Sequence, residues 1–212
     1  MTMTQKERYD KLGTSVVKAL TARHFEAYYC TDTQSACEKL LSLIPEGDTV
    51  AWGGSQTLSE IGAQDLLRAR GQSLIDRDTA KTPEERNAIM RAALTCDTFL
   101  MSSNAISEDG QLVNMDGNGN RVAALIYGPR QVIVVAGLNK VAKDLDAAIA
   151  RVRGTAAPTN AQRFNVTTPC KITGTCADCK SPDCICANMV ITRICKPAGK
   201  IKVILVGENL GM

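Results

Sequence analysis

Four short runs of apolar residues limit what this chain can fold into. They are DTVAWGG at 48–54, TFLMSS at 98–103, QVIVVAG at 131–137 and KIKVILVG at 200–207. Turn-forming residues bound these runs, and polar residues do not alternate within their apolar centres. This pattern is typical of strands covered on both faces in a mostly parallel sheet. We therefore expect a sheet buried between two layers of helices.

Helical patterns fill the segments between these runs. Apolar residues recur at helical spacing over 6–24, 37–44 and 58–71, where the last helix is expected to end at Gly71. A proline stands in the first turn of a further pattern at 83–94. Alternating helices and strands predict an α/β fold. We expect a three-layer, Rossmann-like, mostly parallel sheet in one domain spanning 1–212.

Composition and charge exclude two classes of partner. The net charge is only +3, aromatic residues make up 4% of the chain, and basic residues are scattered among acidic ones. A nucleic-acid partner is therefore not expected. The apolar runs have the length of strands and not of membrane spans. We expect a soluble, cytoplasmic protein, with no membrane partner, that could form a homo-oligomer.

The cysteines predict a metal site near the end of the chain. Six of nine cysteines lie between 170 and 195, and Cys170, Cys176, Cys179 and Cys186 are spaced C-x5-C-x2-C-x6-C. Cys184 is a second candidate for the fourth position, and Cys195 is a further thiol. We expect a Cys-rich metal-binding insert at about 168–196.

Three explanations compete for these thiols. Disulfides belong to small secreted domains, and this chain begins with no apolar signal segment. Structural zinc takes four thiolates, commonly from two C-x-x-C pairs, whereas only Cys176 and Cys179 form such a pair. An iron-sulfur cluster also takes four cysteines, often beside a proline, and Pro169 precedes Cys170. We favour the cluster and keep zinc as the alternative.

A first polar loop follows the strand predicted at 48–54. Gly53 and Gly54 allow close approach of a ligand to the backbone, and Ser55 and Thr57 supply hydroxyl groups. The loop could hold a phosphate, a carboxylate or a cofactor tail. Alternatively, Thr57 and Glu60 form a capping box at the start of the next helix.

A second polar loop, at 102–121, is denser in functional groups. Asp109-Gly110 predicts a hairpin within it. Glu108 is the candidate nucleophile or acid/base, and Arg121 is the candidate anion clamp. Alternatively, Glu108 flanks the hairpin and Arg121 faces solvent. The segment 116–120 lacks the terminal glutamate of a calcium loop.

Other candidate residues are fewer. Asn139 and Lys140 directly follow the strand predicted at 131–137, so either could meet a ligand, although a lysine there could equally be solvated. His24 is the only histidine and ends the first helix, which argues against histidine catalysis. Cys30, Cys37 and Cys96 are expected to be small core residues.

The loop motifs WGGSQTLSEIG, SSNAISEDGQLVNMDGNGNR and YGPRQVIVVAGLNK, with TPCKITGTCADC and the closing KVILVGENLG, resemble the LUD domain family, named for lactate utilisation. The resemblance implies a fold like that of sugar-phosphate isomerases and coenzyme A transferases. It marks twelve loop residues: Gly53, Gly54, Ser55, Thr57, Glu60, Ser103, Asn104, Glu108, Asp116, Gly117, Asn120 and Arg121. The four tail cysteines match short, cysteine-tailed members.

Three functions are compatible with these features. The first is a redox accessory role in organic-acid (lactate) metabolism, with an iron-sulfur site and possible iron-sulfur redox partner proteins. The second is an enzyme of the coenzyme A transferase or sugar-phosphate isomerase type with structural zinc. The third is a regulatory module that binds an organic acid. Each implies a small organic acid or a phosphorylated or CoA-type ligand.

Overall fold

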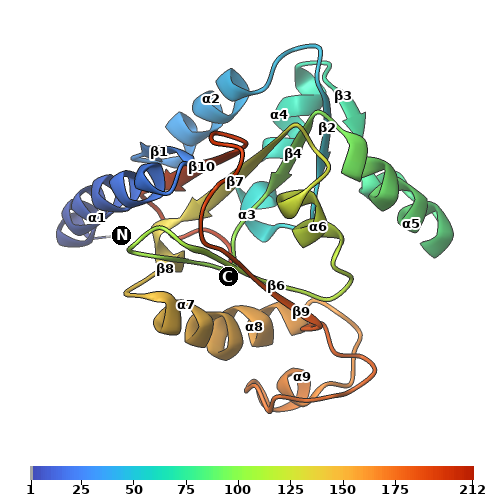
Figure 1. Cartoon of the computed structure of the whole chain (residues 1–212). Coiled ribbons are helices and arrows are strands. Elements are labelled where there is room, and N and C mark those ends of the chain that lie inside the picture. The colour runs from blue at the N-terminus through green and yellow to red at the C-terminus, as the bar shows by residue number, and fades with distance from the viewer. Residues whose placement is uncertain (1) are drawn as a thin grey trace.

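The computed structural model describes residues 2–212 and is built around a parallel sheet (Figure 1). Its six strands follow the order β1-β10-β7-β4-β2-β3, and all neighbours run parallel. The strands are β1 Glu26–Cys30, β2 Thr49–Trp52, β3 Ser73–Ile75, β4 Thr98–Met101, β7 Gln131–Gly137 and β10 Ile201–Val206. All four apolar runs supply strands of this sheet, which confirms the predicted α/β fold.

Helices cover both faces of this sheet. They are α1 Met3–Ala22, α2 Thr33–Leu43, α3 Gln56–Glu60, α4 Ala63–Ala69 and α6 Asn120–Ile126. Helix α5 Pro83–Ala92 buries none of its residues and packs on the short 3-10 turns η1 Arg77–Thr79 and η2 Ala93–Thr95. Successive residues of one strand point to opposite faces. Accordingly Ile133 packs with the residues of α2, α3 and α4, whereas Val132 packs with those of α1 and α6.

The helix predicted over 58–71 is wrong in its extent. Two helices, α3 and α4, occupy this region, and Gly62 separates them with a φ of 69°. A left-handed residue ends a helix, and glycine adopts that conformation without steric cost. Gly71, with a φ of 71°, follows the end of α4 as expected.

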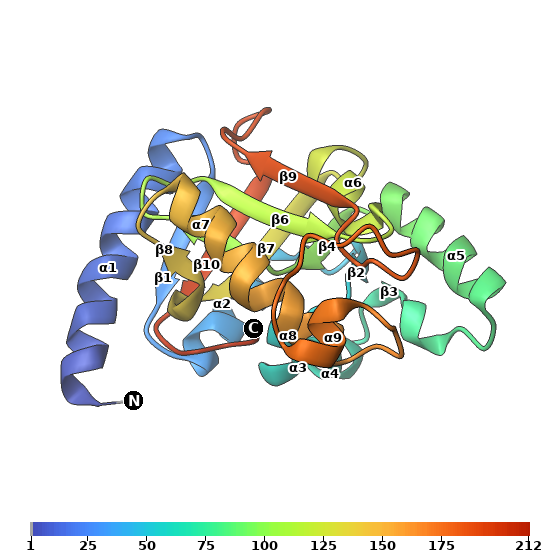
Figure 2. The same cartoon turned by 90° about the horizontal axis from the view of Figure 1, so that it is seen from below.

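A second, smaller sheet lies on one side of the main one. It has the order β8-β5-β6-β9, with β5 Ala105–Ser107, β6 Leu112–Asp116, β8 Val141–Ala142 and β9 Asn188–Thr192. Strands β5 and β6 form the hairpin predicted at Asp109-Gly110. Figure 2 shows β6 and β9 side by side. The pairing of β9 with β6 was not predicted, because it joins segments far apart in the sequence.

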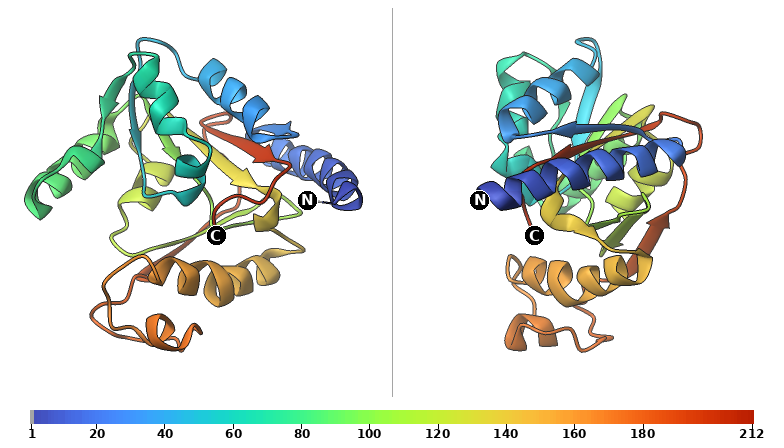
Figure 3. Two further views of the ribbon diagram at one scale, coloured as in Figure 1. Left: turned by 180° about the vertical axis from the view of Figure 1, so that it is seen from behind. Right: turned by 90° about the vertical axis from the view of Figure 1, so that its left-hand side faces the viewer.

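A run of helical segments covers the outer face of the second sheet (Figure 3). It consists of α7 Leu145–Arg151, the π-helical segment η4 Val152–Ala156 and α8 Ala157–Ala161, and it follows the 3-10 turn η3 Leu138–Lys140. Ala105 and Val113 of the sheet pack against Ala148 and Val152 of this run. Helix α9 Pro169–Thr173 and the cysteine loop lie beyond it. This outer layer places the cysteines beside the second sheet.

Within residues 2–212, none of the helices combines the length and the apolar character that a bilayer crossing requires.

Candidate functional site

A cavity of about 470 Å³ opens at the carboxyl ends of the central strands. Strands β3, β2, β4 and β7 are neighbours, and the loops that follow them meet at one edge of the sheet. Parallel α/β sheets usually bind their ligands at this edge. The structure brings together on the cavity wall nine of the residues predicted from the sequence, namely Gly54, Ser55, Ser103, Asn104, Asp116, Gly117, Asn120, Arg121 and Lys140.

Four other predicted residues support the wall from behind. A Cβ atom added at Gly53 would lie 3.0 Å from Cδ of Arg121, so the missing side chain makes room for that arginine. Thr57 is fully buried and accepts a hydrogen bond from Lys140. The Glu60 carboxylate accepts the Gly211 N–H, and Asn139 Oδ1 accepts the Leu210 N–H. These residues position the site and do not line it.

Glu108 lies outside the cavity. It follows β5 near the hairpin tip, where its carboxylate pairs with Lys143 Nζ at 2.9 Å. Its backbone N–H donates to the Ala142 carbonyl of the neighbouring strand. In this arrangement the structure does not bring the candidate nucleophile to the other predicted site residues.

The start of α3 uses a different cap from the predicted capping box. Ser55 is the N-cap residue, and its Oγ accepts the Leu58 N–H at 3.2 Å. Thr57 and Glu60 are therefore free of the capping role, and the capping-box interpretation is wrong. Ser55 is preferred because the helix starts two residues earlier than the T-x-x-E pattern indicates.

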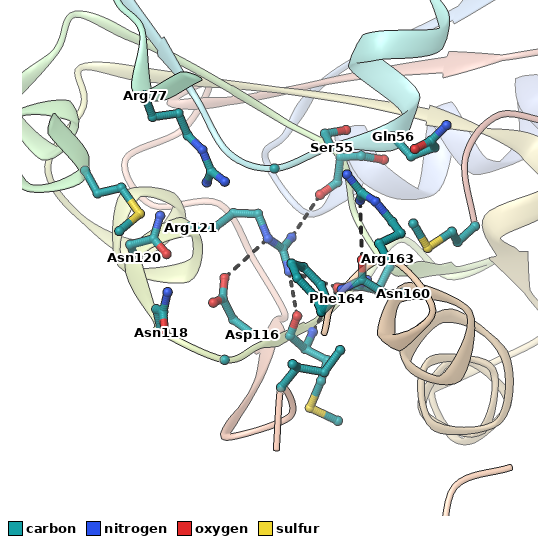
Figure 4. Close-up of a pocket in the computed structure, with 18 of the residues that line it drawn as sticks. Ser55, Gln56, Arg77, Asp116, Asn118, Asn120, Arg121, Asn160, Arg163 and Phe164 are labelled. Carbon is teal, nitrogen blue, oxygen red and sulfur yellow. Dashed lines mark hydrogen bonds and ion pairs between the residues drawn. The ribbon is translucent and has the colours of Figure 1, made fainter. Parts of the chain in front are cut away.

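Arg121 is the central cross-link within the second polar loop, at 102–121 (Figure 4). Its guanidinium donates to the Ser102 and Met115 carbonyls at 3.0 and 2.7 Å and pairs with Asp116 at 3.3 Å. It also donates to the side-chain oxygens of Asn114 and Asn104, at 2.7 and 2.9 Å. Neither predicted role, a free clamp or a solvated residue, describes these contacts. The N–H donors of the Arg121 guanidinium are already used in these contacts, which stabilise the cavity wall.

Three other arginines line the cavity and give its wall a positive charge. Arg77 of η1, Arg86 of α5 and Arg163, just after α8, all line it, and Figure 4 shows Arg77 and Arg163 entering from different elements. Arg77 Nε is buried and has no hydrogen-bond partner among residues 2–212, although Asp78 lies 3.7 Å away. Burial lowers the pKa of Arg77, and repulsion from Arg86 and Arg163 adds to this.

These three arginines were not predicted from the sequence. Arg77 comes two residues after the end of β3, so the strand-end rule that selected Lys140 applies to it too. Arg86 and Arg163 carry no such signal, because Arg86 lies within α5 and Arg163 follows α8, so neither comes directly after a strand.

Lys140 is a buried amine at the base of the site, with 4% of its surface exposed. Nζ donates to Thr57 Oγ1 at 2.8 Å and to Ser102 Oγ at 2.9 Å. Burial lowers its pKa to about 7, and the positive charges of Arg151 and Arg121 act in the same direction. Lys140 is therefore poised to exist as a neutral amine near neutral pH.

A second cavity, of about 270 Å³, is lined by five thiols. Cys170 comes from α9, Cys176 and Cys179 from the following loop, and Cys184 and Cys186 from the segment before β9. Burial, together with the neighbouring thiols, raises the pKa of Cys186 to about 12. Thus all four predicted ligands and the alternative, Cys184, face one space.

Cys195 is separate from this group. It is buried in the main core, where its Sγ donates to the Pro197 carbonyl at 3.2 Å. Cys30, Cys37 and Cys96 are likewise buried, as predicted for core residues.

Thiolates suit iron-sulfur clusters and zinc, so the donor chemistry of the second cavity fits either group. Across residues 2–212, no three histidine, cysteine or carboxylate side chains are spaced to bind one metal ion. Any bound group would therefore require the cysteine loop to adjust or would have to bridge more widely spaced sulfurs.

The two cavities share part of their walls. Met115 of β6 and Ile185, which lies between Cys184 and Cys186, line both. A Cβ atom added at Gly117 would lie 3.3 Å from the Ile185 carbonyl oxygen, so glycine lets the cysteine segment pack against the polar loop. A ligand in the arginine-lined cavity would thus be separated from the thiol-lined cavity by this shared wall.

Comparison with solved structures supports the fold assignment. A DUF162 family protein from Deinococcus radiodurans matches with a TM-score of 0.53 and 10% identity, over 93% of this chain and 98% of that one. At this identity the match shows the fold alone. eIF2B delta from Chaetomium thermophilum has a TM-score of 0.37 at 17% identity, over 57% of this chain and 54% of that one. The eIF2B-beta2-delta2 complex from C. thermophilum has a TM-score of 0.41, also at 17% identity, over 81% and 55%.

Comparison with sequences gives the family. None of the curated protein sequences matches the chain significantly. The family model of the LUD domain matches residues 14–206, which include the whole parallel sheet, both polar loops and the cysteine segment. The chain therefore belongs to the LUD domain family.

Proposed function

We propose that the protein binds a small organic acid, or its phosphorylated or CoA-type derivative, in the arginine-lined cavity, and an iron-sulfur cluster at the adjoining thiols. It would act as a redox accessory protein in organic-acid metabolism. Membership of the LUD family relates the chain to lactate utilisation. The observation that carries the proposal is the shared wall of the two cavities, formed by Met115 and Ile185.

The charges around the first cavity favour an anion. Among residues 2–212, Arg77 has only a 3.7 Å ion pair with Asp78, and Arg163 only a 3.4 Å hydrogen bond to Asn160. Both therefore keep donors for a ligand, whereas the donors of Arg121 are already used. Guanidinium groups bind carboxylate and phosphate oxygens through paired hydrogen bonds. An anion would also offset the burial, and the repulsion from Arg86 and Arg163, that lower the pKa of Arg77. Arg121 would keep the wall in place without contacting the ligand directly.

The thiol cavity favours a group larger than one ion. Zinc binds sulfur at about 2.3 Å, so four thiolates around it must come close together. Among residues 2–212 no three such side chains are spaced to bind one metal ion, and five cysteines line a cavity of about 270 Å³. Cys170, Cys176, Cys179 and Cys186 would hold the cluster, with Cys184 able to replace Cys186. A bound cluster would supply an electron carrier next to the anion cavity.

Replacing Cys176 by serine is expected to abolish the cluster. The protein would be purified without oxygen, and its visible spectrum and its iron, sulfide and zinc contents measured. We expect brown wild-type protein, colourless Cys176→Ser, and an unchanged spectrum for Cys30→Ala, whose thiol lies in the core. Comparing Cys184→Ser with Cys186→Ser identifies the fourth ligand. Colourless wild-type protein with one bound zinc would reject the redox role.

Removing an arginine from the cavity is expected to weaken anion binding. Arg77→Ala and Arg163→Ala should each raise the dissociation constant of pyruvate or phosphate about tenfold or more, because a charge-assisted hydrogen bond contributes roughly 1.5–3 kcal/mol. Titration calorimetry would measure this. Arg130→Ala is the matched control, because Arg130 is solvent-exposed and pairs with Asp97. Equal affinities for all four proteins would contradict the anion site.

Lys140 favours a second candidate function, an enzyme of the transferase or isomerase type with structural zinc. A buried amine that is neutral near pH 7 is a usable base or nucleophile. Glu108, the other candidate for this chemistry, pairs with Lys143 outside the cavity. A zinc-containing, colourless protein would favour this second function.

A further inference from the structure

We propose that Lys140 forms a Schiff base with the carbonyl carbon of a 2-oxo acid bound in the arginine-lined cavity. The inference rests on the anion binding proposed above and extends it, because it assigns a substrate class and a covalent step. Its basis is the position of Nζ on the wall of that cavity, together with two hydroxyl groups.

The hydrogen bonds around Lys140 suit a neutral amine. A neutral amine has two N–H donors and one lone pair, and Nζ donates to two oxygens, those of Thr57 and Ser102. Both hydroxyls can in turn donate to backbone carbonyls, Thr57 to Leu210 at 3.5 Å and Ser102 to Ser103 at 3.4 Å. This leaves their oxygens to accept from the amine. With both N–H groups used, the lone pair is free to attack.

Lys140 has no carboxylate partner. Within residues 2–212 it forms no ion pair, and the facing acid, Glu60, instead accepts from the Gln56 side chain and the Gly211 N–H. A buried ammonium without a counter-ion is costly, so the neutral form is favoured. A lysine with a purely structural role would be expected to pair with a carboxylate or to keep its charge in water.

The charged groups that face Lys140 come from three elements. Burial disfavours its protonation most, Arg151 of α7 and, to a smaller extent, Arg121 of α6 act in the same direction, and Glu60 of α3 opposes them. With a pKa of about 7, roughly half of the Lys140 side chains are neutral at pH 7, against about one in 2,500 for an ordinary lysine. At pH 7 the neutral, nucleophilic fraction of Lys140 is therefore far larger than that of a surface lysine.

The ligand must carry both a carbonyl and an anionic group. The amine needs an electrophilic carbon, and the arginines, Arg77 above all, need an anion to pair with. A 2-oxo acid holds the two groups on adjacent carbons. In the reaction, the Nζ lone pair forms a bond to the carbonyl carbon, and the oxygen leaves with the two amine protons as one water molecule. The product is an imine, and no electrons are transferred to or from a third group.

Reductive trapping tests this inference with pyruvate as the probe. Full-length protein would be incubated with pyruvate and cyanoborohydride, and the adduct located by peptide mass spectrometry. We expect one reduced adduct, on Lys140, that is lost in Lys140→Met and in Lys140→Arg. Lys143→Met, which removes an exposed lysine close in sequence, should trap as well as wild type. Circular dichroism would confirm that the variants fold.

The pH dependence of the trapping rate distinguishes an amine with a lowered pKa from an ordinary lysine amine. Trapping at Lys140 should rise through pH 7 and then level off, because the neutral amine is the reactive form. A surface lysine would react faster up to about pH 10. A rate that keeps rising beyond pH 9 would overturn the inference.

Failure of the covalent step can be distinguished from failure of the anion site. If pyruvate raises the melting temperature of wild type but not of Arg77→Ala, and no adduct forms at Lys140, the anion site stands and the Schiff base is rejected. Adducts spread over surface lysines would also reject it. If pyruvate neither binds nor reacts, both proposals fail for this ligand class.

Discussion

Replacing Arg121 by methionine is expected to lower the free energy of unfolding by about 3–5 kcal/mol, the range found when one partner of a buried charged network is removed. The guanidinium joins the loop after β4 to the end of β6 through carbonyl and amide oxygens and through Asp116. In the variant these acceptors would stay buried without a donor. The loop after β4 would separate from the end of β6, and the anion cavity would lose its shape.

Urea unfolding followed by circular dichroism would measure this loss. Arg130→Met is the matched control, because the Arg130 side chain is 85% exposed and its pair with Asp97 is expected to contribute less than about 1 kcal/mol. Equal midpoints for the two variants would show that Arg121 is not a structural cross-link. The free-clamp role predicted from the sequence would then regain support.

The stability of the wild-type protein relative to Lys140→Met is expected to rise by roughly 2–3 kcal/mol between pH 6 and pH 9. The folded-state pKa of Lys140, about 7, lies below the ordinary value of 10.5. Between these two values the unfolded chain binds more protons than the folded one. Stability therefore increases with pH across this window, and the contribution of Lys140 is lost as pH falls through 7.

Chemical denaturation at several pH values would measure the difference in unfolding free energy between wild type and Lys140→Met. Subtracting the Lys140→Met curve removes the effect of the other titrating groups, such as Cys96 and Tyr28, whose raised pKa values remain in both proteins. A difference in unfolding free energy that does not change with pH would mean that Lys140 keeps an ordinary pKa. It would also remove the electrostatic support for a reactive amine, whereas the trapping experiment tests the covalent step itself.

Much of the fold follows from local patterns in the chain. The apolar runs at 98–103, 131–137 and 200–207 are strands, because a strand buried on both faces needs no polar alternation. The hairpin at Asp109-Gly110 forms because glycine accepts the φ of 88° found there. The break at Gly62 was missed, because an isolated glycine within a helical pattern does not by itself reveal a left-handed backbone.

The candidate site was predictable only where it depends on strand ends. Gly54, Ser103 and Lys140 were found because parallel strands deliver the loops that follow them to one edge of the sheet. Glu108 was chosen for its chemistry, but its position at a hairpin tip takes its side chain away from that edge. Arg163 was not found, because it follows a helix and not a strand, and only the tertiary structure brings it to the cavity.

The amino-acid sequence by itself determined the α/β class, the burial of the parallel strands on both faces and the grouping of cysteines near 170–195. These features depend on composition and on spacing along the chain. The tertiary structure decided which groups meet. The pairing of β9 with β6 places the cysteine segment against Met115, and burial without a counter-ion lowers the pKa of Lys140. Both depend on contacts between residues far apart in sequence, which no local pattern records.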